Sequence, residues 1–91
     1  MLKKVYKYVI DDPQGTSMNL PANAEILTIG LQYGKINIWA EVPETWEKNE
    51  RIFCAIATGE RFDKSCHRYV GTVQVPSTPL GELVWHIYEV L

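Results

Sequence analysis

Two cysteines and two histidines are the residues of this sequence best suited to metal binding or nucleophilic chemistry. Cys66 and His67 are adjacent, whereas Cys54 and His86 lie elsewhere in the chain. A zinc site needs about four N, S or O ligands, and sequences often supply them through paired spacings such as C-x-x-C. No such pair occurs here, so we expect no metal site and no cofactor. Cys54, within an apolar run, is expected to act as a small buried hydrophobe.

Two possible arrangements of a cysteine nucleophile fail on spacing or on direction. The segment between Cys54 and Arg61 is one residue too long for the phosphate-binding loop of cysteine phosphatases, which must aim successive N–H groups at the phosphate. Cys66 and His67 are neighbours, and neighbouring side chains on an extended chain point to opposite sides. The sequence therefore predicts no catalytic residue, and a protein that is not an enzyme.

Aromatic and arginine side chains are the residues most typical of a binding surface. Trp39 allows two interpretations, packing in a second layer or contact with a partner, whereas Trp46 lies in a polar loop and is hard to assign to a core. Arg61 and Arg68 lie near the two ends of one loop, where they could share an anion or simply be solvated. Such residues anchor protein interfaces, and aromatic rings also stack on nucleotide bases. The candidate ligand- or partner-binding residues are Trp39, Trp46, Arg61, Arg68, His86 and Tyr88.

Length and composition exclude several classes of protein. The 91 residues suffice for one core, and 46% apolar with 22% charged residues is typical of a globular chain. A net charge of −2 makes nucleic acid an unlikely partner, because that affinity depends on Lys and Arg opposite phosphates, although Lys3, Lys4 and Lys7 could form one basic patch. No stretch approaches the roughly 18 apolar residues of a membrane span, so no membrane partner is expected. Two cysteines and no signal peptide predict reduced thiols in the cytoplasm.

The turn-forming residues recur at short intervals, which predicts an all-β fold for residues 1–91 as a single domain. We expect six to seven short strands in a small antiparallel sandwich or a partly closed barrel, with at most one helical turn, best placed at 44–48. Thr58-Gly59 ends a buried strand, and the glycine favours a sharp turn there over close approach of a ligand.

A hairpin centred on Tyr33-Gly34 is the clearest local structure. A tight type I′ or II′ turn at these residues makes positions that sum to 67 face each other. One face is then apolar, and a slip of one residue would scatter that face. The expected apolar pairs are Leu31–Ile36, Ile29–Ile38 and Leu27–Ala40, and the opposite face pairs Thr28–Trp39, Gly30–Asn37 and Ile26–Glu41.

The remaining strands differ in how their apolar residues are distributed between the two faces. Residues 52–57 are apolar throughout, as expected for a strand covered on both faces. Residues 69–75 place Tyr69, Val73 and Val75 on one side. The last strand places residues 83, 85 and 87 on one face and 84, 86, 88 and 90 on the other. Apolar character on two faces requires another layer, which a sandwich, a barrel or a homo-oligomer could supply.

The chain resembles a family of uncharacterised proteins encoded by phages and prophages, which is classed as a domain of unknown function. The resemblance covers nearly the whole chain and carries no functional residues. It rests on these segments in order: Lys4-Val5-Tyr6-Lys7-Tyr8 near the N-terminus, 18–27, Trp39-Ala40, Thr58-Gly59, Tyr69-Val70-Gly71-Thr72, and the closing Leu83-Val84-Trp85-His86-Ile87-Tyr88-Glu89. It implies a small accessory protein of the host-cell cytoplasm that acts by stoichiometric binding.

The favoured hypothesis is a non-enzymatic binding module, with a counter-defence or host-takeover role, that occupies a host protein or sequesters a nucleotide-type small ligand and forms a homo-oligomer. One alternative is a structural or assembly protein that buries its second aromatic face against copies of itself. Another is a small enzyme or metal protein that uses His67, His86, Cys66 or Glu89.

Overall fold

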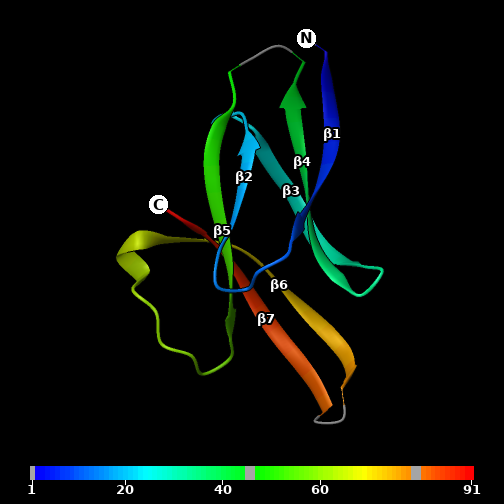
Figure 1. Cartoon of the computed structure of the whole chain (residues 1–91), viewed down its shortest axis with the longest axis vertical. Helices are drawn as coiled ribbons and strands as arrows, with labels where there is room; N and C mark the ends of the chain where they lie inside the picture. Colours follow the sequence, from blue (N-terminus) through cyan, green and yellow to red (C-terminus); the bar gives the residue numbers. More distant parts are fainter. Residues whose placement is uncertain (1, 45–46, 79–80) are drawn as a thin grey trace.

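The computed structural model describes residues 2–44, 47–78 and 81–91, and its strands form two antiparallel sheets (Figure 1). The elements in chain order are β1 (Lys3–Ile10), β2 (Thr16–Leu20), β3 (Glu25–Gln32), β4 (Lys35–Pro43), β5 (Asn49–Ala57), a 3-10 turn (Lys64–Cys66), β6 (His67–Thr78) and β7 (Gly81–Val90). The predicted all-β antiparallel sandwich is therefore confirmed, with seven strands in the part of the chain described.

The strand order is β1-β4-β3 in the first sheet and β2-β5-β7-β6 in the second. These sheets do not join into a closed barrel within the described residues, so the barrel alternative is not the one observed. β3 and β6 come into contact along one side of the sandwich. β1 and β2 are edge strands of their respective sheets and are not hydrogen-bonded to each other.

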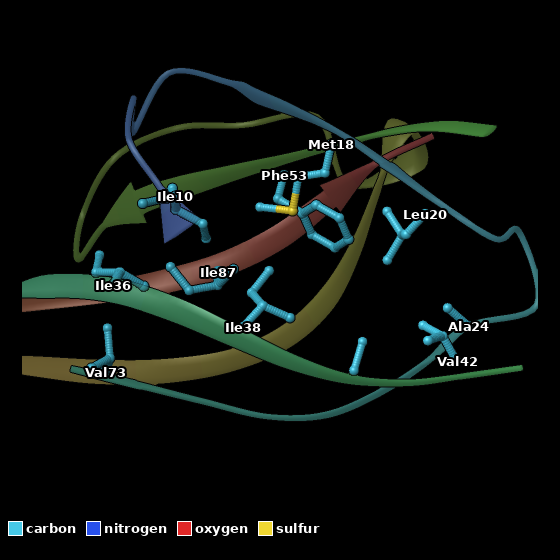
Figure 2. Packing of buried hydrophobic residues seen from close by; sticks show 12 residues of the cluster. Ile10, Met18, Leu20, Ala24, Ile36, Ile38, Val42, Phe53, Val73 and Ile87 are labelled. Atoms are coloured by element: carbon cyan, nitrogen blue, oxygen red, sulfur yellow. The ribbon is translucent and has the colours of Figure 1, made fainter. Parts of the chain in front are cut away.

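The core lies between the two sheets, where the inner faces of the strands interdigitate (Figure 2). Leu20, Ile38, Phe53 and Ile87 are fully buried there. β5 is buried on both faces, as its apolar sequence predicts. Phe53 and Ala55 pack in the core, whereas Cys54 points the other way and is also buried.

The predicted hairpin between β3 and β4 is confirmed around its turn and wrong beyond it. Tyr33 and Gly34 have φ values of 55° and 74°, as a type I′ turn requires. Residues 28–31 face residues 36–39 in the predicted register. A β-bulge at Leu27 then shifts the register, so Ile26 pairs with Ala40 and Leu27 is 47% exposed. The expected pairs Leu27–Ala40 and Ile26–Glu41 are therefore wrong.

A second β-bulge, at Val70, means that the expected placement of Tyr69 and Val73 on the same face of β6 is wrong. Tyr69 pairs with Tyr88 and Val73 pairs with Trp85, so Tyr69 and Val73 lie on opposite faces of the sheet. The extra residue reverses the alternation at that point. Tyr69 is consequently exposed, whereas Val73 is buried in the core.

The helical turn lies elsewhere than the sequence suggests. The expected position, 44–48, includes two residues outside the described part of the chain, and the observed 3-10 turn is Lys64–Cys66. Asp63 caps this turn, because its Oδ1 accepts hydrogen bonds from the Ser65 amide at 2.9 Å and hydroxyl at 2.7 Å. In the part of the chain that the structure describes, no helix has the length and apolar character needed to cross a membrane.

Candidate functional site

The loop of residues 58–66 begins with a sharp turn, which also supplies a hydrogen-bond acceptor for a backbone amide at the end of β5. The Glu60 amide donates to the carbonyl of Ala57 at 3.0 Å, and Gly59 has a φ of 91°, which is a type II turn. The Glu60 carboxylate accepts a hydrogen bond from the Ala57 amide at 3.0 Å. The turn expected at Thr58-Gly59 is therefore confirmed, and the Glu60 side chain caps the strand edge beside it.

Replacing Gly59 with alanine is expected to destabilise the protein by about 1–2 kcal/mol, because an L-residue is strained at this positive φ. Urea denaturation measures the change in the free energy of unfolding. Gly15→Ala is the matched control, since a Cβ at Gly15 meets its nearest neighbour, Cγ2 of Ile52, at an ordinary 3.8 Å and its φ is not positive. Equal losses in both variants would contradict the strain argument.

An open cleft of about 700 Å³ lies between this loop and the turn that joins β1 to β2. We call it the loop cleft. The Ala55 amide donates to the carbonyl of Pro13 at 2.8 Å, which holds the β1–β2 turn against β5. The residues that line the cleft are Asp12, Pro13, Gln14, Cys54, Ala55, Ile56, Glu60, Arg61, Phe62, His67 and Trp85. An apolar lining with a few polar groups is typical of binding pockets.

Aromatic side chains from the loop and the outer face of the second sheet pack beside the loop cleft. The ring of Phe62 lies 4.7 Å from that of Tyr88 and 5.6 Å from that of His67, measured between centroids. The ring of Tyr69 also lies 5.4 Å from that of Tyr88. The loop is thus attached to the sheet through rings, and Tyr88 is half-buried beneath it.

Both ring nitrogens of His86 lie within hydrogen-bonding distance of a threonine hydroxyl. Nε2 lies 2.8 Å from the Thr58 hydroxyl, and Nδ1 lies 3.1 Å from the Thr72 hydroxyl. Thr72 in turn lies 2.6 Å from the hydroxyl of Tyr69. The imidazole therefore ties the start of the loop to β6 and β7.

The groups that could perform nucleophilic or acid–base chemistry differ in their surroundings, since Cys54 is buried whereas Cys66 is exposed. Burial, reinforced by the charge of Glu60, raises the pKa of the Cys54 thiol and keeps it protonated. Nδ1 of His67 donates to the carbonyl of Asp63 at 2.7 Å, since a carbonyl can only accept. The hydrogen bonds from Ser65 lower the pKa of Asp63. No cluster of three or more His, Cys, Asp or Glu residues that could hold a metal ion occurs within the described ranges.

A buried ion pair near the C-terminal end of β7 was not anticipated from the sequence. Nε and Nη2 of Arg51 donate to the two oxygens of Glu89 at 2.7 and 2.8 Å, and these side chains are only 10% and 7% exposed. Arg51 also donates to the carbonyls of Pro21 and Ala24 at 3.3 and 3.0 Å. Nη2 of Arg68 donates to Glu89 at 2.8 Å. These bonds fasten the β2–β3 turn to the second sheet.

The predicted site residues separate into two groups. Three lie at the loop of residues 58–66: Arg61 lines the loop cleft, His86 contacts Thr58 at the start of the loop, and Tyr88 contacts Phe62 within it. Trp39 is half-buried on the outer face of the first sheet, where its Cζ3 lies over Gly30, so it does not pack between the layers. Arg68 contacts Glu89 and is 60% exposed.

Trp46 lies outside the described residues. Sequence reasoning missed Phe62 and Trp85 as cleft residues. The aromatic character of Phe62, within a polar loop, was the available signal.

Fold and site together define a small β-sandwich with a loop-lined cleft. The sequence matches, over residues 1–91, the profile of a family described as Domain of unknown function (DUF7352). The chain therefore belongs to that family. No curated protein and no solved structure gives a significant match.

Proposed function

We propose that the protein is a non-enzymatic binding module that acts by occupying a protein partner, which inserts an apolar side chain into the loop cleft. The observation that carries this proposal is the combination of an apolar floor with a rim of charged groups at one open cleft. Ala55, Ile56 and Phe62 supply apolar surface there. The neighbouring thiol is held protonated, which supports binding over catalysis.

The charges at the rim favour a protein partner over a polyphosphate at this cleft. Asp12 and Glu60 contribute carboxylates, whereas Arg61 contributes one guanidinium, which has no hydrogen bond or ion pair with any residue the structure describes. A polyphosphate would meet more like charge than opposite charge. A partner with an acidic group opposite Arg61 and a basic group near Asp12 complements the rim.

The resemblance to phage- and prophage-encoded proteins supports a finer proposal. We propose that the partner is a host protein and that its occupation serves counter-defence or host takeover in the host cytoplasm. The homo-oligomer expected from the sequence stays a prediction, which light scattering during gel filtration tests directly.

Reversing the charge of Arg61 is expected to weaken partner binding by about tenfold or more, because an arginine at the rim of an apolar anchor site is a typical hot spot. The partner is first captured from host extract by the immobilised wild-type protein and purified. Calorimetric titration then compares the wild type with Arg61→Glu.

Lys64→Ala is the control for this experiment, because Lys64 is exposed in the same loop and does not line the cleft. The melting temperature of each variant should stay at the wild-type value. Equal affinity of Arg61→Glu and the wild type would refute the placement of the partner at the loop cleft.

A further inference from the structure

A second groove opens on the side of the sandwich where β1 and β2 are not hydrogen-bonded to each other. Its volume is about 380 Å³, and we call it the basic groove. Figure 1 shows the start of β1, the end of β2 and the end of β4 at the same end of the molecule. The residues that matter for the argument are Lys4, Tyr6 and Tyr8 of β1, Asn19 of β2, and Glu44 and Lys48 from the segment after β4.

The register of β1 explains why its side chains reach this groove. Lys4, Tyr6 and Tyr8 pair with Val42, Ala40 and Ile38, which are buried in the core, and paired residues share a face of the sheet. Tyr8 packs against the core, whereas Tyr6 is 47% exposed. β2 is only five residues long, so the inner face of β1 extends beyond the core towards the N-terminus.

The groove is positively charged although the whole chain carries a net charge of −2. The ammonium groups of Lys4 and Lys48 have no hydrogen bond or ion pair with any residue the structure describes. Lys3, by contrast, pairs with Glu41 at 3.2 Å. Glu44 is the carboxylate among the groove residues named above. Two unpaired ammonium groups that face one cavity create a local field that attracts anions.

Two tyrosines supply an aromatic surface beside these charges. The rings of Tyr6 and Tyr8 lie 6.5 Å apart at 67°, in an edge-to-face arrangement. Burial, reinforced by the neighbouring Tyr6, raises the pKa of Tyr8, so its phenol remains a hydrogen-bond donor at neutral pH. The exposed ring of Tyr6 is the surface on which a planar group can stack.

We infer that the basic groove binds a nucleoside monophosphate, with its base against Tyr6 and its phosphate between Lys4 and Lys48. The groove falls in the size range of small-molecule sites. A phosphate places its charge on one compact group, which suits two ammonium groups that line one small groove better than the spaced carboxylates of an acidic peptide. This site differs in place and ligand from the loop cleft.

Titration of the ¹⁵N-labelled protein with AMP tests the inference, with GMP, CMP and UMP as further probes because stacking tolerates any base. We expect shifts confined to the groove residues and saturation at one ligand per chain. Inorganic phosphate alone and adenosine alone should each bind at least about tenfold more weakly than AMP. Saturation by a hexaglutamate peptide at lower concentration than AMP would overturn the assignment in favour of an acidic peptide.

Variants of single residues locate the ligand. Lys4→Ala, Lys48→Ala and Tyr6→Ala should each weaken AMP binding by about fivefold or more. Lys64→Ala, which removes the same charge at a distant exposed position, should bind like the wild type. Arg61→Glu should also bind AMP normally, so failure of this inference is distinguishable from failure of the proposed partner site. No AMP binding at millimolar concentration, or equal weakening by Lys4→Ala and Lys64→Ala, would refute the inference.

Discussion

Replacing Glu89 with glutamine is expected to lower the free energy of unfolding by about 3–5 kcal/mol. The side chain of Arg51 is only 10% exposed, and in this variant it loses the one charged partner it has among the described residues, since its other acceptors are backbone carbonyls. An uncompensated buried guanidinium is costly, even though the glutamine has nearly the same shape as the glutamate. Urea denaturation followed by tryptophan fluorescence measures the loss.

Glu82→Gln is the matched control for this experiment, because Glu82 lies exposed on the same strand. It should change stability by less than about 0.5 kcal/mol. A loss of similar size in both variants would show that the Arg51–Glu89 pair contributes little.

The same ion pair gives stability a defined dependence on pH. The hydrogen bonds from Arg51, and after them the one from Arg68, hold the pKa of Glu89 below its ordinary value. A carboxyl whose pKa is lower in the folded state contributes stability above its unfolded pKa, and this contribution is lost as the pH falls through the folded value. The wild type should therefore lose more stability than Glu89→Gln on acidification below about pH 4.5. Parallel pH profiles of the two proteins would contradict this.

Replacing Gly71 with valine is expected to cost about 1–3 kcal/mol, because this position has no room for a branched side chain. A Cβ at Gly71 would lie 2.9 Å from Cδ1 and 3.1 Å from Cγ1 of Ile29, where β6 contacts β3. Gly71→Ala should cost less, since the nearest atom is the mobile end of the isoleucine. Denaturation of both variants measures the difference.

Shortening Ile29 tests whether this contact is the cause. In the Ile29→Ala background, Gly71→Val should be clearly less destabilising than in the wild type, which appears as a coupling energy in the double-mutant cycle. If the cost of valine is the same in both backgrounds, the cause is the backbone of the bulge at Val70 and not the packing between β3 and β6.

The sequence allowed the architecture to be predicted where turn chemistry and hydrophobic pattern agree. Tyr33-Gly34 fixes one hairpin through its positive φ values, and the apolar run of β5 indicates its double burial. The bulges at Leu27 and Val70 could not be predicted in the same way. Both strands carry apolar residues on each side of the bulge, so the pattern fits either register, and packing against the neighbouring strands decides between them.

The candidate site was predictable only in part, for a related reason. Arg61, His86 and Tyr88 could be singled out by residue type, and the loop that gathers them was visible as a polar segment. The pairing of Arg51 with Glu89, which are 38 residues apart, depends on the register between β5 and β7. Nothing in the local sequence of either residue indicates it.

The pairing of strands that are distant in the sequence also has a consequence for how the chain folds. β3 with β4, and β6 with β7, are hairpins of neighbouring strands, and such units form within microseconds. β1 can pair only after β4 has formed, and this pairing brings together residues as distant in the sequence as Lys3 and Pro43. β2 likewise can pair only after β5 has formed. We therefore expect two early hairpins, a late docking of the first twenty residues, and overall folding in milliseconds to seconds, as is usual for a topology with such distant pairings.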